Sequence, residues 1–342
     1  MAPVSPSTSD EWSGTFARRP VREQTTMMTY RYEIGYGKHR VPVYRTHARP
    51  LRGIRPIPES AFTGRENTLL ALEIDVDVIG DDFLPAYTEG DNGMVVATDS
   101  MKNFVLRESL NYDGATLEGL LHLLGTRFAA TYEQLRHLRL TGRELPFSAA
   151  SVPSSGGSFA PSDVLFARSN GDYATATLEL AADADGAAVR VVAHQCGRVG
   201  LRLLKTTGSS FTSFVRDGYT TLPDRRDRPL FVFMDVHWRY ADPLDALGDD
   251  PSRYVPAEQV ADVVRSVFHQ FVSESIQHLV HEMGTRLLER FPPLAAVSFS
   301  AENRTRDPVA ESETDPRVKV YSDPFPAYGV ISLTMRRAGV EA

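Results

Sequence analysis

The segment LEIDVDVIG, residues 72–80, alternates apolar and polar side chains along most of its length. A two-residue period is typical of a strand with one buried and one wet face, and here the wet face carries Glu73, Asp75 and Asp77. Residues 30–46, YRYEIGYGKHRVPVYRT, alternate in a similar way. We expect the two segments to pair as a hairpin joined by a long loop.

The period changes further along the chain. Between residues 99 and 134 apolar side chains recur at helical spacing, and the break NYDG divides this region into two predicted helices. Strand character returns at residues 135–145 and 172–180. The Ser-, Gly- and Pro-rich segment 147–163 lies between these strands, and we expect it to form a loop.

The second half of the chain repeats this order of elements. It contains a helical region at residues 260–291, which we interpret as one broken helix or as two helices. Strands are predicted around it at residues 187–207, 228–241, 293–303 and 327–337. Strands and helices are thus segregated, which indicates an α+β fold with antiparallel sheets, each covered by helices on one face. A doubly wound nucleotide-binding fold is argued against.

Composition excludes several classes of protein. The chain has 342 residues and a formal net charge of −7 at pH 7, so a general affinity for nucleic acid or anionic membranes is not expected. No apolar run approaches the ~20 residues needed to span a bilayer. The single cysteine, Cys196, excludes an internal disulfide and agrees with a reducing compartment, so we expect a cytoplasmic protein. Residues 1–28 are predicted to form a disordered tail.

Several familiar chemical motifs are absent from the sequence. It contains no Gly-rich dinucleotide fingerprint, no phosphate-binding loop ending in Lys-Ser or Lys-Thr, and no Gly-x-Ser-x-Gly nucleophile elbow. His278 and His281, followed by Glu282, form the metal-site candidate of the sequence. Helix histidines more often lie on a solvated face, so we expect neither a metal site nor an organic cofactor.

A crowded polar segment, TDSMKN, follows the apolar residues before it. Thr98, Asp99 or Ser100 would suit the N-cap of a helix beginning near Met101, which explains one or two of these side chains. Together with YGKHRV, TTGSSFTSFVRDGYTTLPDRRDR, SIQ, FSAEN and YGVI, this segment resembles the urate oxidase family. The resemblance covers about residues 30–337, with the phrases in the family's order.

The resemblance implies a role for individual side chains. It places catalytic groups at Lys38, Thr98 and Asn303, and the end of a proton relay at the position of Thr305. Substrate-binding residues are implied at Asp99, Phe211, Arg228, Ile276, Gln277 and Ile331.

The residue types suit recognition of a flat oxopurine anion. Arg228 offers a planar fork for two acceptors, Gln277 offers one donor and one acceptor, and Phe211 offers a face for stacking. Taken singly, each has a simpler interpretation: a surface charge run, a wet helix face and a core ring. Their joint occurrence in the family's order favours substrate binding.

Urate-type anions are electron-rich enough to react with O2 themselves, so no cofactor is required. The protein must bind the anion, arrange proton removal and hold O2 or water over the ring. Lys38, if partly buried, could take a proton relayed through the hydroxyl of Thr98. Asn303 would hold O2 or water above the substrate by an amide hydrogen bond.

One position departs from the family pattern. The family has a histidine two residues after the asparagine, and this chain has Thr305 there. A hydroxyl cannot carry charge near neutral pH as imidazole does. Three interpretations stay open: a urate oxidase with an altered relay, a related oxygenase of another oxidisable heterocycle, and a catalytically silent purine-binding protein.

The resemblance also implies an architecture. The family fold is a tandem pair of T-fold domains, which here would span residues 29–184 and 185–339. It assembles as a homotetramer around a tunnel. Each active site lies between subunits, with Thr98 and Asp99 supplied by a neighbour.

Overall fold

The computed structural model describes residues 30–154, 156–183, 188–304, 306–322 and 327–340. The chain divides into two compact units, residues 1–33 and residues 34–342. Of the first unit only residues 30–33 are described, so the predicted disordered tail at residues 1–28 lies outside the described residues.

One antiparallel sheet of eight strands forms the centre of the second unit. The predicted hairpin of the first two strands is confirmed. In spatial order the strands are β1 (Gly35–Thr46), β2 (Leu69–Ile79), β3 (His137–Glu144), β6 (Tyr173–Ala182), β7 (Val189–Lys205), β8 (Leu230–Tyr240), β9 (Leu294–Asn303) and β12 (Gly329–Arg336).

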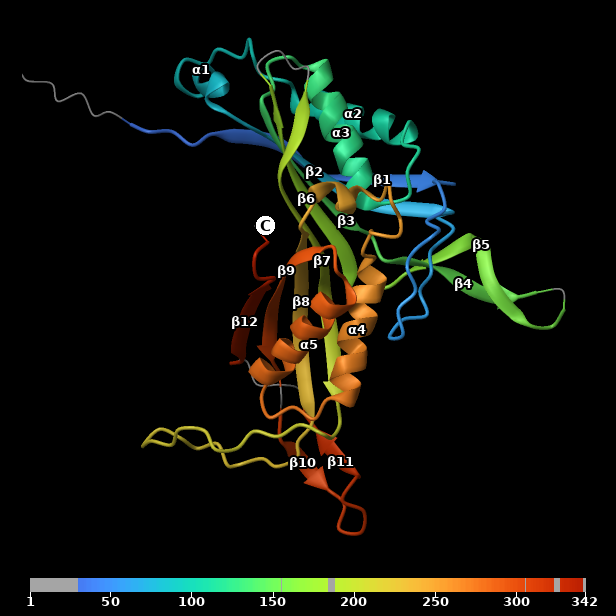
Figure 1. The fold of residues 1–342 in the computed structure, drawn as a ribbon, viewed down its shortest axis with the longest axis vertical. Coiled ribbons are helices and arrows are strands. Elements are labelled where there is room, and N and C mark those ends of the chain that lie inside the picture. The colour runs from blue at the N-terminus through green and yellow to red at the C-terminus, as the bar shows by residue number, and fades with distance from the viewer. Residues whose placement is uncertain (1–29, 155, 184–187, 305, 323–326, 341–342) are drawn as a thin grey trace, which may run out of the picture. The chain divides into compact units, whose positions relative to one another are not determined.

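Four long helices pack on the sheet. They are α2 (Thr98–Leu110), α3 (Leu117–Thr131), α4 (Ala257–Gln270) and α5 (Ile276–Arg290). Helix α2 packs on β1, α3 on β3 and β6, α4 on β7, and α5 on β9 and β12, as Figure 1 shows. The helical region at residues 260–291 is therefore two helices, which settles the alternative that the sequence left open.

The α+β prediction is confirmed, and the repeat is visible in the sheet. The first half supplies β1, β2, β3 and β6 with α2 and α3, and the second half supplies β7, β8, β9 and β12 with α4 and α5. Strands β6 and β7 pair directly, so the two halves share one continuous sheet. The domain boundary between residues 184 and 185 stays a prediction, because both residues lie outside the described part.

Burial alternates along the strands, as a sheet covered on one face requires. In β8 every second residue from Leu230 to Tyr240 is buried, and those between them are partly exposed. The opposite face carries charged side chains, such as Asp75 and Arg143, whose carboxylate oxygen and guanidinium nitrogen lie 2.7 Å apart.

The loop prediction for residues 147–163 is wrong. Most of this segment forms a two-stranded sheet of its own from β4 (Phe147–Pro153) and β5 (Phe159–Arg168). The turn is held by Ser154, whose backbone N–H and side-chain hydroxyl both donate to the Ser158 carbonyl oxygen at 2.8 Å. The hairpin is held by main-chain hydrogen bonds and needs no buried apolar face, so its composition did not reveal it.

Shorter elements complete the fold. They are η1 (Asp81–Phe83), α1 (Leu84–Thr88), η2 (Pro243–Leu247), β10 (Pro308–Glu311) and β11 (Lys319–Tyr321), and the sequence predicted none of them. Among the described residues, no helix has the length and apolar character to cross a membrane.

Candidate active site

The first group of predicted site residues lies where α2 packs on β1. Helix α2 begins at Thr98, and Ala97 occupies the N-cap position with no side-chain capping bond. The expected capping role of Thr98, Asp99 or Ser100 is therefore wrong. The Thr98 side chain is exposed and has no hydrogen-bond partner among the described residues, so its hydroxyl remains available for other chemistry.

Asp99 is held within its own helix. Its two carboxylate oxygens accept hydrogen bonds from Lys102 Nζ at 2.6 Å and from Asn103 Nδ2 at 2.9 Å. The hydrogen bond from Lys102 is the main reason that the pKa of Asp99 is lowered, and the charge of Lys38 also contributes. Lys38 is thus a neighbour of Asp99 in the same chain.

A bulge in β1 sets the position of Lys38. The register with β2 shifts between Lys38 and Val41, and Lys38 lies opposite the buried residue Val76. A side chain at Gly37 would approach the Val76 carbonyl oxygen to 2.1 Å, so only glycine allows the two strands this close beside the lysine. The structure therefore gives a physical reason for the sequence YGK.

The second group begins in the long loop between β7 and β8, the yellow loop low in Figure 1. Its two ends form a short ribbon: the N–H of Phe211 donates to the Arg225 carbonyl at 2.7 Å, and the reverse bond is 2.9 Å. The N–H of Arg228 donates to the Ser209 carbonyl at 2.8 Å. The ribbon brings the Arg228 guanidinium carbon over the Phe211 ring, 5.3 Å from its centroid.

The ribbon lies beside the segment that leads into α5. The N–H of Ser210 donates to the Ser273 carbonyl at 2.8 Å, and Ser275 caps the helix by accepting from the His278 N–H at 3.0 Å. Ile276 and Gln277 are the first two residues of α5. Ile276 is buried in the core, whereas Gln277 is exposed.

Asn303 is the last residue of β9, between Val232 of β8 and Gly329 of β12. This is the end of the sheet at which the β7–β8 loop enters β8. Ile331, in β12, is partly buried and packs against the core. Thr305 lies outside the described residues.

Arg228 is the charged side chain of the second group, and its surroundings shift its pKa. Burial lowers the pKa of its guanidinium, the charge of Asp307 counteracts this, and Arg225 adds repulsion. The Nε atom of Arg228 is buried, and no hydrogen-bond partner for it is found in the described part of the chain. Because an unpaired buried donor is costly, an anionic ligand with a matching acceptor would be favoured here.

The sequence does not single out Phe214, which stacks on Phe211. The two rings are nearly parallel, with centroids 4.9 Å apart and planes 9° apart, and the Arg216 guanidinium lies 4.7 Å from the Phe214 centroid. The spacing of two phenylalanines in SSFTSF was the only sequence signal for this pair.

The two groups do not meet within one chain. In Figure 1 the elements of the first group, β1 and α2, lie in the upper part of the view, and the β7–β8 loop lies near the bottom. The structure thus places the candidate residues in two separate groups: one with Lys38, Thr98 and Asp99, and one with the remaining described candidates.

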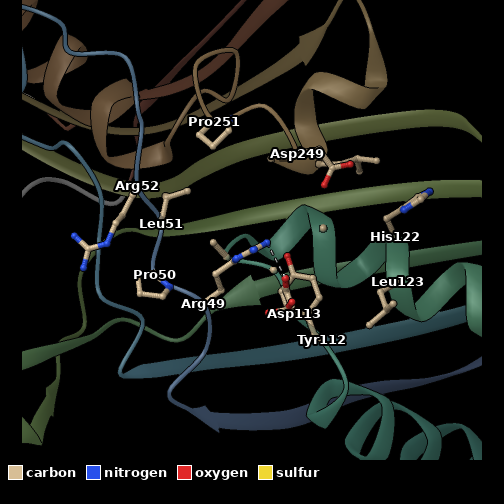
Figure 2. A pocket seen from close by; sticks show the side chains of 15 residues that line it. Arg49, Pro50, Leu51, Arg52, Tyr112, Asp113, His122, Leu123, Asp249 and Pro251 are labelled. Atoms are coloured by element: carbon tan, nitrogen blue, oxygen red, sulfur yellow. Dashed lines mark hydrogen bonds between the residues drawn. The ribbon is translucent and has the colours of Figure 1, made fainter.

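A cavity of about 640 Å³ lies elsewhere, between the start of α3 and the loops before β2 and α4. Figure 2 shows Arg49, Arg52, His122 and Asp249 among its lining residues, with Tyr112 below them. No predicted site residue lines it, and its charges are mixed. The candidate site therefore lies in the two groups of residues around α2 and the β7–β8 loop.

The two histidines that the sequence offered as metal ligands, His278 and His281, have surroundings typical of ordinary helix side chains. His278 packs its ring edge-on against Phe271, with centroids 4.7 Å apart, and His281 is exposed. In the described ranges, no three His, Cys, Asp or Glu side chains are arranged to hold a metal ion.

Comparison with known proteins gives consistent results. The family model described as Uricase matches residues 194–331. The chain is 46% identical over 308 residues to a uricase of Halalkalicoccus jeotgali and 45% identical over 309 residues to a uricase of Haloferax volcanii, covering 90% of this chain and 99% of each relative. Among solved structures, urate oxidase from Bacillus sp. TB-90 matches with a TM-score of 0.85 at 41% identity, over 89% of this chain and 100% of the other.

Proposed function

Because the chain belongs to the uricase family, we propose that it oxidises urate with O2 and water to 5-hydroxyisourate and hydrogen peroxide. Urate loses two electrons, O2 takes them up with two protons, and water supplies the new hydroxyl oxygen. The observation that carries this proposal is the partly buried Arg228 guanidinium, which lies over Phe211 and whose Nε donor has no hydrogen-bond partner among the described residues. The reaction needs no cofactor, because the urate anion itself reduces O2.

Binding is assigned to the second group of residues. The Arg228 fork pairs with two acceptors on the edge of the urate anion, and its partial desolvation strengthens this contact. Phe211 stacks on the purine face, and the exposed amide of Gln277 pairs with another part of its edge. The partly buried Ile331 supplies apolar surface beside the ligand, and Ile276, buried in the core, fixes the start of α5 next to Gln277.

Proton transfer and O2 positioning are assigned to both groups. Asn303 holds O2 or water above the purine ring through its amide. Lys38 removes a proton through the hydroxyl of Thr98, which both donates and accepts. Asp99, fixed by Lys102 and Asn103, holds the start of α2 beside the substrate.

A complete site then requires two copies of the chain. The separation of the two groups in Figure 1 supports an active site between subunits. Strands β1 and β12 are the edges of the sheet and offer main-chain groups for pairing with another copy, which supports the homotetramer. The cytoplasm, inferred from the single cysteine, stays a prediction.

The test uses purified protein after metal removal. Loss of urate absorbance with equal uptake of O2 is the expected result, and calorimetry without O2 measures urate binding in parallel. Tight binding without turnover would indicate a silent purine-binding protein. Absence of binding would indicate another oxidisable heterocycle, the interpretation that Thr305 favours. A monomeric mass by light scattering would contradict the shared site.

A further inference from the structure

Asp227 lies directly before Arg228, and its carboxylate joins the two ends of the β7–β8 loop. One carboxylate oxygen accepts from the Thr207 hydroxyl at 2.7 Å, and the other accepts from the Gly208 N–H at 2.7 Å. Thr207 and Gly208 follow β7 closely, and Asp227 precedes β8. The contacts therefore close the base of the loop that carries Phe211 and Arg228.

The same base is where the ribbon begins. Gly208 has a left-handed backbone, with φ of 78°, and it turns the chain from β7 into the ribbon. The next residue, Ser209, accepts from the N–H of Arg228 at 2.8 Å. The Asp227 carboxylate binds Thr207 and Gly208, and the main-chain bond joins the next pair, Ser209 and Arg228. These contacts therefore fix neighbouring residues on both strands of the ribbon.

A carboxylate is well suited to this position because hydrogen bonds to a charged acceptor are stronger than neutral ones. Burial alone would raise the pKa of Asp227, but hydrogen bonds from Thr207, Gly208 and Ser209 outweigh burial and lower it. The carboxylate is therefore ionised in the pH range where urate is an anion. A negative charge at Asp227 repels the urate anion and so opposes its binding. We therefore expect the carboxylate to have a structural role that offsets this repulsion.

Asp227 is connected to Arg228 through the main chain, because the two residues are adjacent in the sequence. The charges that shift the pKa of the Arg228 guanidinium are those of Asp307 and Arg225. The carboxylate of Asp227 is directed instead to the other end of the loop. Removal of Asp227 would therefore leave the charge environment of Arg228 largely as it is and change its position.

We propose that Asp227 is a positioning residue for substrate binding, which holds the base of the loop so that Arg228 and Phe211 face one ligand together. This inference rests on the proposed function, because the ligand is the urate anion. It also predicts that Thr207 has a supporting role through its hydroxyl.

The experiment compares Asp227→Ala, Asp227→Asn and Thr207→Val with the full-length wild-type protein. Asp227→Ala should raise KM for urate roughly 10- to 100-fold and change kcat less, because Arg228 is displaced but still present. Asp227→Asn keeps one acceptor and should recover part of this loss. Thr207→Val removes the hydroxyl bond and leaves the backbone bonds to the carboxylate, so it should fall between Asp227→Ala and wild type.

Asp217→Ala is the matched control. Asp217 lies in the same loop and also accepts from a backbone N–H, that of Tyr219 at 2.9 Å, and from a threonine hydroxyl, that of Thr220 at 3.0 Å. It carries the same charge but does not lie at the base of the ribbon. Its replacement should leave KM within about twofold of wild type.

Two readouts separate positioning from loss of fold. Amide hydrogen exchange at Phe211 and Arg228 should accelerate in Asp227→Ala and not in Asp217→Ala, while the melting temperature stays close to wild type. An unchanged KM with unchanged exchange would overturn the role of Asp227 and leave the proposed function intact. Failure of wild-type protein to bind or oxidise urate would overturn the proposed function, and hydrogen exchange would still report whether Asp227 holds the ribbon.

Discussion

The guanidinium carbon of Arg228 lies 5.3 Å from the centroid of the Phe211 ring, although the two residues stand at opposite ends of a long loop. The ribbon between them, closed by the Phe211–Arg225 bonds, fixes this relationship. A planar anion that stacks on the ring therefore comes within reach of the guanidinium. Stacking and edge recognition are in this way combined on one short piece of main chain.

Arg228→Lys tests the edge recognition. Lysine keeps the charge but loses the planar fork, so we expect urate binding to weaken by roughly 1.5–3 kcal/mol, with most of the kinetic loss in KM. Calorimetry without O2 and steady-state kinetics measure the two effects. Arg226→Lys is the control, because Arg226 is an exposed neighbour in the same charge run. Equal effects of the two substitutions would place the ligand elsewhere.

Mixed oligomers test how the two groups combine. Lys38 is a neighbour of Asp99 in one chain, so Lys38 and Thr98 should enter a site together, and Arg228 should come from another copy. Inactive Lys38→Ala and Arg228→Ala chains should regain activity after subunit exchange, with about a quarter of the sites intact in a random mixture. Activity is measured before and after mixing.

Lys38→Ala mixed with Thr98→Ala is the control for this experiment. No site in such a mixture can contain both groups, so activity should stay low. Recovery in this mixture would mean that Lys38 and Thr98 reach the substrate from different chains, and the grouping by β1 and α2 would be wrong.

The order of strands and helices could be predicted from the sequence, because an element that buries one face carries apolar residues at a regular spacing. The spacing is every second residue in a strand and every third or fourth residue in a helix. Residues 72–80 became β2, and the two helices at residues 99–134 became α2 and α3. Where main-chain bonds and not burial hold a segment, the period is absent. The β4–β5 hairpin is such a segment, and its prediction as a loop was wrong.

The candidate residues were found by resemblance, but their grouping needed the structure. The bulge at Lys38 and the packing of α2 on β1 explain why Lys38 lies near Asp99, and neither is visible in the spacing of YGK and TDS. Phe214 and Asp227 were missed because a stacked ring and a loop-closing carboxylate depend on how the loop folds back.

Glu118 should make stability depend on pH. This residue of α3 is buried, and its carboxyl pairs with the Tyr254 hydroxyl at 3.0 Å. Burial raises the pKa of Glu118 to about 7, and the facing groups from other elements are Tyr254, Cys196 of β7 and Glu144 of β3. The native state therefore holds a proton that the unfolded chain releases near pH 4.5.

The direction of this pH dependence follows from the number of protons that the native and unfolded states bind. Between about pH 4.5 and pH 7 the native state binds more protons, so rising pH lowers the free energy of unfolding, by on the order of 3 kcal/mol in total. Glu118→Gln keeps the shape and cannot ionise, so its stability relative to wild type should rise with pH and level off above about 7. Urea unfolding at pH 5, 6, 7 and 8 measures this. A constant difference across the series would show that Glu118 does not titrate in this range.

Position 305 is a threonine, where the resemblance to the family implies a histidine. Two other histidines could compensate. His194 is a poor relay, because its Nε2 accepts from the Tyr240 N–H at 2.8 Å and burial lowers its pKa to about 4. His39, next to Lys38, is better placed, and its ring nitrogen lies 2.6 Å from the Asp77 carboxylate, which raises its pKa.

Thr305→His and His39→Gln distinguish these cases. If no group replaces the missing imidazole, Thr305→His should raise kcat on urate, by up to the ~10²-fold typical of a general acid–base group, and leave urate binding nearly constant. If His39 carries the proton, Thr305→His should change little and His39→Gln should lower kcat. The pH dependence of kcat should then flatten in the range above 6.5, because Asp77 raises the pKa of His39 from that value. In our proposal Arg228, Phe211 and Gln277 hold the ligand in both cases. A large change in urate affinity in either variant would therefore show that position 305 or 39 contacts the substrate and is not part of a relay.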